Sequence, residues 1–573
     1  MNIMEKKSTG YPSIDKPWEK YYITPPECAE KLENGTLYEA YVAANRDNLD
    51  GLAIIMMDGG HRYTHRELIN MVDLAANGFS NMGVGLNSRV AIMLNNTVEE
   101  AVALLALNKL GALSIFIDVT KSISDIKYTL SPSRAHLLII DEIMMPMEAY
   151  VNTNNTPIII ANQTKPSEKG IPFFALYGMG QGNHINPAIY EKNRPAIMIN
   201  SSGTTGIPKP IVHTNHSVNM AALKMMCSDY PLGRHNVIMK IIPSYIGLGL
   251  ITTLYTGLLT GTIIVLIGGN NPHQSIMNTV TFASSFPLFR EGVGIKPEAK
   301  LLMFTAPMYF RILCEKLDIF EDLSYMGALL AAGSKMGEKE LEVMNQQLAS
   351  RNCPVKICNG YGQNEMCGAV TLNTNSANKP GSAGFPVIGC NVRIVNPETL
   401  ETLEPNIEGL VVEQSESKFL YYDNLPEETA ASMITLPDGT VWFNTKDLGM
   451  LDYEGFLHIT GRVSRVLVRF DFKLSIDKIE EKIKRHPAVF DCAVIAIRKS
   501  EIEEVPVAYI VLNETNANDS IDNVLSQIQN GDEPLSEMEY PAQIVKLPHL
   551  PYMKNGKVDY RALEREAQTL NTH

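Results

Sequence analysis

Residues 201–209 read Ser-Ser-Gly-Thr-Thr-Gly-Ile-Pro-Lys, and this stretch decides how the rest of the 573-residue chain is interpreted. An apolar run at 196–199 precedes it and predicts a buried strand. Two glycines among four hydroxyl side chains allow successive backbone N–H groups to converge on an anion, and Lys209 adds a positive charge. The stretch therefore predicts a polyphosphate-binding loop. It is not a P-loop, because the glycine spacing differs and no Gly-Lys-Ser/Thr is present.

The overall composition indicates a multidomain globular protein. At 573 residues the chain is too long for one ordinary domain, and 45% hydrophobic with 20% charged residues is typical of a globular fold. The formal net charge is −14. An acidic chain is a poor ligand for nucleic acid, whose phosphates dominate binding affinity, and for an anionic membrane surface. We therefore expect neither as a partner.

The eight cysteines are spread thinly along the chain and form no Cys-x-x-Cys pair. This pattern indicates a reducing compartment, so we expect a cytoplasmic protein without a disulfide framework. Cys353, Cys358 and Cys367 form the closest group. They lack regular metal-ligand spacing and a nearby histidine, which favours core thiols over a zinc site.

Neither the polar N-terminal segment nor the long uncharged stretch of this sequence predicts a membrane anchor. Residues 1–22 are polar and charged and lack the apolar core of a signal peptide. The uncharged stretch 248–268 is long enough to span a bilayer, but Gly257 and the Thr260-Gly261 pair interrupt it. We expect a buried helix, a tight turn and a buried strand at 262–267, with no integral membrane association.

Residues 37–140 alternate between helical and strand patterns. Thr64 and Glu67 form a capping-box pair that opens an amphipathic helix extending to about residue 82. Such alternation predicts parallel strands covered by helices on both faces. The segment 141–190 is irregular and polar, and no element is predicted there. The predicted helices are 37–45, 65–82, 99–109 and 217–226, and the predicted strands are 53–57, 89–94, 114–117 and 136–140.

The loop at 201–209 closely resembles the phosphate loop of the adenylate-forming (AMP-binding) superfamily. This group contains acyl-CoA synthetases, firefly luciferase-like enzymes and the adenylation domains of nonribosomal peptide synthetases. Their loop reads Ser/Thr-Ser-Gly-Ser/Thr-Thr-Gly-x-Pro-Lys-Gly, and Pro210 stands here in place of the last glycine. The resemblance implies that ATP phosphates bind Ser201, Ser202, Gly203, Thr204, Thr205, Gly206 and Lys209, with Thr204 also serving catalysis.

A second motif at 359–365, Asn-Gly-Tyr-Gly-Gln-Asn-Glu, follows a predicted strand at 355–358. Glycines let the backbone approach a flat ring, Tyr361 can stack on a base, and Glu365 suits a hard cation such as Mg²⁺. The motif resembles the family's Tyr-Gly-x-Thr-Glu, with Asn364 in place of the threonine. The resemblance implies a catalytic and metal-binding Glu365 and nucleotide contacts from Gly333, Asn359, Gly360, Tyr361, Gly362 and Asn364.

A third motif at 442–449 resembles the family's Tyr-x-Thr-Gly-Asp-Leu, with Lys446 in place of the glycine. The resemblance implies that Asp447 accepts hydrogen bonds from both ribose hydroxyls, a bidentate geometry that suits a carboxylate. A predicted hairpin over 452–462 follows. Its end supplies Arg462, which matches the family arginine at the ribose or phosphate, and Ile459 as a further nucleotide contact.

The last motif, Leu-Pro-Tyr-Met-Lys-Asn-Gly-Lys at 550–557, resembles the family's Leu-Pro-x-Thr-x-x-Gly-Lys. Asn-Gly favours a tight turn that would project Lys557, and the resemblance implies a catalytic lysine whose charge neutralises the reacting oxyanions. Two further positions depart from the family. Ser464 occupies the hinge, where relatives mostly carry Asp or Lys. Asp471 occupies the place of a glycine near the pantetheine arm of the thiol acceptor, where it either obstructs the arm or is displaced by a one-residue shift.

These patterns predict an α/β protein of two domains. Residues 1–462 would form a large domain of stacked mixed sheets covered by helices, which binds ATP and the carboxylate. Residues 463–573 would form a small, mobile α+β domain that carries Lys557, with a helix at 475–484 and strands at 489–497 and 505–512.

The implied reaction is ATP-dependent adenylation of a small carboxylic acid, followed by transfer to a thiol. The stretch 236–268 is nearly all apolar and lacks the aspartate that pairs with an amino acid's α-amine, which favours an acyl-CoA ligase with coenzyme A as acceptor. The ending Asn-Gly-Lys-Val-Asp favours instead a stand-alone adenylation protein that loads an acyl or aminoacyl group onto the phosphopantetheine of a separate carrier protein. A third alternative is a nucleotide-binding protein without catalysis. The sequence leaves the acid, the acceptor and the oligomeric state open.

Overall fold

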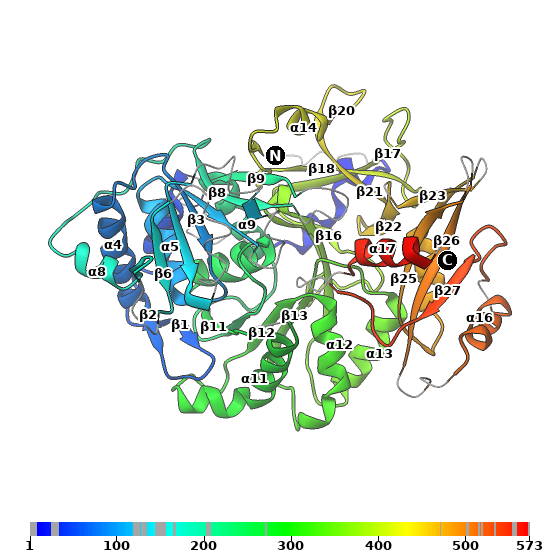
Figure 1. Cartoon of the computed structure of the whole chain (residues 1–573), viewed down its shortest axis with the longest axis horizontal. Helices are drawn as coiled ribbons and strands as arrows, with labels where there is room; N and C mark the ends of the chain where they lie inside the picture. Colours follow the sequence, from blue (N-terminus) through cyan, green and yellow to red (C-terminus); the bar gives the residue numbers. More distant parts are fainter. Residues whose placement is uncertain are drawn as a thin grey trace, which may run out of the picture.

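The computed structural model contains two large sheets, a smaller third sheet and a C-terminal unit at one end of the molecule (Figure 1). The predicted residues Ser202, Gly203, Thr204, Thr205, Gly206, Ser464, Asp471 and Lys557 lie outside the described residues. Those described are 9–23, 32, 34–118, 126–127, 135–143, 156–163, 168–201, 208–269, 272–463, 465–469, 472–499, 503–513, 516, 519–531, 534–552 and 558–570.

The two large sheets are parallel in their centres, and antiparallel strands form both edges of the first sheet and one edge of the second. The order of the first is β16 (Phe385–Pro386), β15 (Gly368–Leu372), β14 (Ile357–Gln363), β13 (Met326–Ala331), β12 (Leu301–Thr305), β10 (Val237–Lys240), β11 (Ile263–Leu266), β1 (Leu52–Met56), β2 (Arg62–Thr64). The order of the second is β19 (Tyr421–Tyr422), β9 (Pro210–Thr214), β8 (Pro195–Asn200), β4 (Leu113–Phe116), β3 (Arg89–Met93), β5 (Leu137–Asp141), β6 (Ile158–Ala161), β7 (Ile171–Pro172).

Helices cover these sheets and fill the space between them. The predicted capping box of Thr64 and Glu67 is present at the start of α4, because each side chain bonds the backbone N–H of the other residue. Helix α5 is buried along almost its whole length and shares one apolar core with strands of both large sheets. The helices are α1 (Pro12–Asp15), η1 (Pro17–Tyr21), α3 (Leu37–Ala44), α4 (His65–Asn81), α5 (Val98–Lys109), α8 (Ala175–Met179), α9 (Asn215–Met226), η3 (Leu248–Tyr255), α10 (Thr256–Thr260), α11 (Pro272–Gly292), α12 (Pro307–Glu315), η4 (Leu317–Ile319), α13 (Glu338–Ala349), η5 (Asn364–Met366) and α14 (Pro426–Ala431).

The uncharged stretch 248–268 forms the predicted helix, turn and strand. The π-helix η3 continues into α10, Gly261 turns the chain with φ 68°, and β11 follows. The prediction that Gly257 breaks the stretch is wrong, since it lies inside α10. A Cβ on Gly257 would lie 2.8 Å from a side-chain carbon of Ile264, so this glycine lets the helix pack against β11. Among the described residues, no helix combines the length and hydropathy that crossing a membrane requires.

The segment 141–190, for which no element was predicted, extends the second sheet. Its strand β6 pairs with β5 in parallel, and β7 pairs with β6. The short helix α8 packs on α4, where a Cβ on Gly78 would lie 2.5 Å from the carbonyl oxygen of Leu176. Strand β6 is an apolar run of four residues, as long as the predicted strand at 114–117, so a signal for it was available in the sequence. Strand β7 has two residues, which are too few for a periodic pattern.

A third sheet connects the large sheets to the C-terminal unit. Its strands β17 (Cys390–Val395), β18 (Gly409–Ser415), β21 (Val441–Leu451) and β20 (Met433–Thr435) pair in that order, and β22 (Leu457–Arg462) pairs with β21. The unit that follows has its own apolar cores. It contains β23 (Val466–Arg469), β24 (Phe472–Ser475), α15 (Ile476–Lys484), β25 (Val489–Arg498), β26 (Glu504–Leu512), α16 (Ile521–Gln529), β27 (Gln543–Lys546) and α17 (Tyr560–Leu570).

Candidate functional site

The ends of the predicted phosphate loop are held together by the β8–β9 hairpin. Asn200 and Pro210 are opposite each other in the antiparallel pair. The backbone N–H of Ser201 donates to the carbonyl of Lys209 at 2.8 Å, and the N–H of Lys209 donates to Ser201 Oγ at 2.9 Å. Ser201 and Lys209, described residues on either side of 202–207, therefore lie next to each other, which is what an anion-binding loop requires of its ends.

The side chain of Lys209 is directed towards helix α14. Its ammonium group forms an ion pair with Glu428 and lies 5.1 Å from the ring centroid of Tyr422. Both members of the ion pair are partly exposed to solvent, so the pair contributes little to stability and is easily exchanged. A phosphate group at the loop would compete with Glu428 for this lysine.

Glu365 lies next to the same cluster. Tyr422 donates its hydroxyl to Glu365 Oε1 at 2.9 Å, and burial raises the pKa of the Glu365 carboxyl. Lys209 and Arg462 act in the opposite direction on this pKa. No group of three or more metal-ligating side chains occurs in the described part of the chain. A single hard carboxylate fits Mg²⁺ that completes its ligand shell with phosphate oxygens and water.

Asn364 connects the second motif to the phosphate loop. Its Nδ2 donates to the carbonyl of Asn200 at 2.6 Å, directly before the loop, and its Oδ1 accepts from the N–H of Gly247 at 3.2 Å. Its own carbonyl accepts from His213 Nε2 at 2.7 Å. Burial lowers the pKa of His213 to about 4, so the ring is neutral and its Nε2 carries the proton. Asn364 thus fixes β8, η5 and the segment before η3 relative to one another.

The glycines of the second motif have a structural role that differs from the predicted one. Strand β14 continues through the motif and pairs with β15. A Cβ on Gly362 would lie 1.9 Å from the carbonyl oxygen of Gly368, and one on Gly360 would lie 2.8 Å from a Leu372 methyl. Glycine is required here for close strand pairing. Nucleotide contact by Gly360 and Gly362 stays a prediction.

Asp447 is the centre of the third motif. It is 2% exposed. The hydroxyl of Tyr361 donates to its Oδ2 at 2.6 Å, Gln363 Nε2 donates to the same oxygen at 3.2 Å, and Arg462 Nε lies 2.8 Å from its Oδ1. The register of β21 and β22 places Asp447 directly opposite Arg462. Tertiary folding therefore brings together three predicted nucleotide-binding residues that are far apart in sequence.

Lys446, which stands where the family motif has glycine, adopts a backbone conformation that favours glycine. Its φ is +60°, in the left-handed region that glycine adopts without a steric cost. A side chain in that region costs about 1–2 kcal/mol. Its carbonyl accepts from the N–H of Val463 at 2.9 Å, which fixes the chain just beyond Arg462.

The remaining predicted residues that the structure describes lie after β13, on β14 and on β22. Gly333 is exposed after β13, with φ +95°. Asn359 is buried on β14, where its Nδ2 donates to the carbonyls of Met336 and Ser382 at 3.3 and 3.4 Å. Ile459 is half-buried on β22, opposite Gly449.

Two sequence profiles decide the family. That of the AMP-binding enzyme family matches residues 41–422, and that of the AMP-binding enzyme C-terminal domain matches residues 478–557. The chain belongs to the AMP-binding enzyme family. This membership confirms the predicted family and the α/β fold class. It also confirms the predicted enzyme class, an AMP-forming acid–thiol ligase that uses ATP, Mg²⁺ and a thiol acceptor. The domain boundary at 462 and the roles of individual site residues stay predictions.

Three relatives illustrate the similarity of this AMP-binding enzyme to known proteins. A 3-hydroxybenzoate–CoA ligase of Aromatoleum sp. (strain CIB) is 25% identical over 507 residues, which cover 88% of this chain and 91% of that protein. A medium-chain fatty-acid–CoA ligase of Escherichia coli (strain K12) is 22% identical over 90% of this chain and 88% of its own length. The anthranilate CoA ligase AuaEII, solved with anthranoyl-AMP, superposes with a TM-score of 0.81 at 21% identity, over 96% of this chain and 100% of that one.

Four further residues of the AMP-binding enzyme were not singled out from the sequence. Tyr422, Gln363 and Glu428 reach Glu365, Asp447 and Lys209 through pairings between distant segments, which no local pattern reports. The fourth is Glu413 on β18. Its signal was available, since it is a carboxylate that directly follows the apolar run 410–412.

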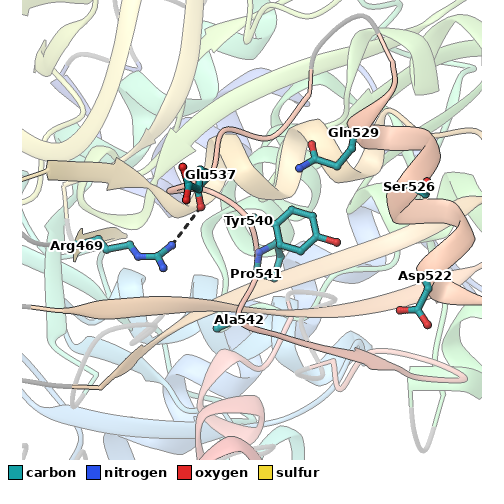
Figure 2. A pocket seen from close by; sticks show the side chains of 8 residues that line it. All are labelled: Arg469, Asp522, Ser526, Gln529, Glu537, Tyr540, Pro541 and Ala542. Carbon is teal, nitrogen blue, oxygen red and sulfur yellow. Dashed lines mark hydrogen bonds between the residues drawn. The ribbon is translucent and has the colours of Figure 1, made fainter.

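A separate hollow lies in the C-terminal unit (Figure 2). The guanidinium of Arg469 at its edge already donates to the backbone carbonyls of Glu537 and Met538 and lies 3.2 Å from Glu503. No nucleotide-site residue contributes to its lining, which consists of Arg469, Asp522, Ser526, Gln529, Glu537, Tyr540, Pro541 and Ala542.

Proposed function

We propose that this AMP-binding enzyme is an acyl-CoA ligase that activates an apolar, small carboxylic acid. The observation that carries the proposal is the cluster of Asp447, Tyr361 and Arg462. Glu365 links this cluster to the phosphate loop, because the charges of Arg462 and of Lys209 both act on its carboxyl group. One end presents a buried carboxylate for ribose hydroxyls, and the other presents a loop for phosphates.

In the first step, a carboxylate oxygen of the acid attacks the α-phosphorus of ATP and pyrophosphate leaves. We assign the phosphates to Ser201, Lys209 and the loop between them, with Thr204 serving catalysis. Lys209 would exchange Glu428 for a phosphate oxygen. Glu365 would hold Mg²⁺, which supplies charge neutralisation on the phosphates when bound. Lys557 would neutralise the oxyanions that form during attack.

The remaining residues would position the nucleotide. We assign the ribose to Asp447 and Arg462, and the base to the ring of Tyr361. Nucleotide contacts are also assigned to Gly333, Asn359, Gly360, Gly362, Asn364 and Ile459. Positioning accounts for much of the rate in phosphoryl-transfer chemistry, so small displacements of these groups would be costly.

In the second step, the thiol sulfur attacks the acyl carbonyl carbon, AMP leaves and the thiol proton is released. We propose that residues 463–573 turn about Ser464 to admit the thiol. Coenzyme A is the proposed acceptor. The phosphopantetheine of a separate carrier protein presents the same thiol arm, so both acceptors belong in the assay. Obstruction by Asp471 would appear as adenylation without transfer.

An apolar acid is favoured by the residues around η3. The one charged side chain of 236–268, Lys240, is fully buried, and its Nζ donates to Asn96 Oδ1 and the Ile242 carbonyl, both at 2.6 Å. No carboxylate from this stretch can pair with a substrate ammonium group. The relatives named as ligases of 3-hydroxybenzoate and of medium-chain fatty acids act on acids of this class.

We also propose that the enzyme works in the cytoplasm. No disulfide joins two of the described cysteines, and six of these seven thiols are buried. Buried free thiols are typical of proteins from a reducing compartment.

The test is carboxylate-dependent exchange of labelled pyrophosphate into ATP, with aromatic acids, fatty acids and amino acids compared in the absence of thiol. Exchange with aromatic or fatty acids is expected. Adding coenzyme A or a phosphopantetheinylated carrier protein then identifies the acceptor by thioester formation. ATP binding without exchange for any acid would contradict the ligase and leave a nucleotide-binding protein.

A further inference from the structure

A buried carboxyl group on β18 has no role in the chemistry described above. Glu413 is 0% exposed, and neither of its oxygens has a hydrogen-bond partner among the described residues. None of the ion pairs between described residues includes it. A polar group buried without a partner is costly, so Glu413 requires an explanation.

Glu413 lies close to Asp447 and Tyr361, two residues of the cluster assigned to the ribose and the base. Strand β18 pairs with β21, which carries Asp447 (Figure 1). Asp447 on β21, Lys224 on α9 and Glu365 on η5 act on its pKa through their charges. The hydroxyl of Tyr361 on β14 lies close enough to lower this pKa as well. The ammonium of Lys224 donates to Ser417 Oγ and to the carbonyl of Ala369, and its charge only partly offsets the raised pKa of Glu413.

The protonation state of Glu413 follows from this setting. Burial, with Asp447 as the next contribution, raises the pKa of Glu413 to about 8. The group is therefore mainly a neutral carboxylic acid at pH 7, which can both donate and accept a hydrogen bond. Neutrality also avoids a third negative charge beside Asp447 and Glu365.

The hydroxyl of Tyr361 faces two carboxyl groups. It donates to Asp447 at 2.6 Å. Burial raises the pKa of this hydroxyl, and the charges of Asp447 and Glu413 raise it further. The proposed function assigns Asp447 to the ribose hydroxyls. When the ribose hydroxyls donate to Asp447, they compete with Tyr361 for its Oδ2. Tyr361 then either shares this oxygen or donates its hydroxyl to another acceptor.

We infer that Glu413 is a positioning residue that accepts the Tyr361 hydroxyl when ribose occupies Asp447. This inference rests on the proposed function. Glu413 touches no substrate and acts through Tyr361, whose ring it would hold in place while the nucleotide is bound. A buried phenol that lost one acceptor and gained none would weaken nucleotide binding.

The first experiment measures ATP and 2′,3′-dideoxy-ATP affinity by calorimetry for wild type and Glu413→Val. The variant is expected to bind ATP about 10-fold more weakly, because Tyr361 loses its second acceptor. The dideoxy analogue leaves Asp447 to Tyr361, so its affinity is expected to change less than about 2-fold. Equal losses for both nucleotides would overturn the inference.

A double-mutant cycle with Tyr361→Phe tests whether Glu413 acts through the phenol. In the Tyr361→Phe background, Glu413→Val is expected to have no further effect on ATP affinity. An additive loss would contradict the inference.

The second experiment uses the nearly isosteric Glu413→Gln and remains informative where Glu413→Val does not fold. Glutamine keeps a donor and an acceptor, so it is expected to recover most of the affinity lost with valine. In the wild type, ATP affinity is expected to fall as pH rises through about 8, because Glu413 becomes charged beside Asp447 and the nucleotide. This alkaline fall should be absent in Glu413→Gln and present in Glu416→Gln, an exposed control that follows the same strand.

The results separate the inference from the proposed function. If the wild type binds no ATP, both fail. If the wild type binds ATP and Asp447→Asn weakens binding, but the Glu413 variants match the wild type at every pH, then the inference alone is wrong.

Discussion

Asp447 and Lys240 are the centres of two buried charged clusters, which differ in the groups that form hydrogen bonds with the buried charge. Asp447 is paired with Tyr361, Gln363 and Arg462, which come from two other strands. Two of these partners donate to the same carboxylate oxygen. Because such donors are side chains that can turn away, a ligand that offers hydroxyl groups can replace them.

Lys240 is the centre of the other cluster. Its ammonium is 0% exposed and donates to the side chain of Asn96 and the backbone of Ile242, with Glu100 Oε2 3.9 Å away. Asn96 in turn donates to the carbonyls of Lys240, Ile241 and Ile267. Burial lowers the pKa of Lys240 to about 8 and raises that of Glu100.

The comparison teaches that burial alone does not identify a functional charge. Around Lys240 the partners include backbone carbonyls that cannot turn away, and they join α5 to β10 between the two large sheets. Around Asp447 the partners are exchangeable. We therefore expect Lys240 to determine stability and Asp447 to determine ligand affinity.

Lys240→Met provides a direct test of this distinction. The variant leaves Glu100 buried without a cation, so the free energy of unfolding is expected to fall by about 3–5 kcal/mol. ATP affinity of the folded protein should be unchanged. Denaturation followed through the buried Trp18 and Trp442 measures the first quantity, and calorimetry measures the second.

A matched double variant, Lys240→Met with Glu100→Gln, should recover much of that stability because no buried charge is left unpaired. A loss of ATP affinity in proportion to the loss of stability would show that the two clusters do not differ in the proposed way.

The variant Lys557→Ala separates the chemical step from the binding of the nucleotide. Carboxylate-dependent pyrophosphate exchange is expected to fall by about 10³-fold, since one charge that neutralises the transition state is lost. ATP affinity should change less than about 3-fold, because Asp447 and the loop at 201–209 remain. The neighbouring Lys554→Ala serves as the control. Normal exchange in Lys557→Ala would refute its catalytic assignment.

Asp447→Asn tests the exchangeable cluster itself. Hydrogen bonds to a charged group contribute about 1.5–3 kcal/mol, so ATP affinity is expected to fall about 10- to 100-fold. The midpoint of denaturation should move little, in contrast to Lys240→Met. Asp438→Asn, which alters an exposed ion pair with Arg393, is the control for a change of charge. An unchanged ATP affinity in Asp447→Asn would remove the ribose assignment.

Lys446→Gly is expected to have the smallest effect. Relief of the left-handed conformation, less the extra backbone entropy of glycine in the unfolded chain, should stabilise the protein by about 0.5–1 kcal/mol. Lys446→Ala keeps the strained φ and should bring no gain. Denaturation midpoints of the two variants measure the difference, and equal midpoints would show that the strain is absent.

Local sequence patterns predicted much of the fold. The helix at α4 followed from a capping box within four residues, and the strand before the loop at 201–209 followed from an apolar run. The two-residue strand β7 and the uninterrupted course of α10 through Gly257 were not predicted, because both depend on a neighbouring strand.

The site divides in the same way. Binding roles could be predicted from the motifs at 201–209, 359–365 and 442–449, since residue types and their spacing are local properties of the sequence. Their partners were not: Tyr361 and Asp447 are 86 residues apart, and Glu365 and Tyr422 are 57 apart.

The sequence by itself thus determined the family motifs, the residues able to bind phosphate, ribose and a hard cation, and the elements that carry them. Tertiary structure alone decided that Lys209 pairs with Glu428, that Tyr361 bonds Asp447, and that Glu413 is buried behind them. The physical reason is that conformation along the chain depends on neighbouring residues. Burial, charge compensation and pKa depend on groups that only folding brings together.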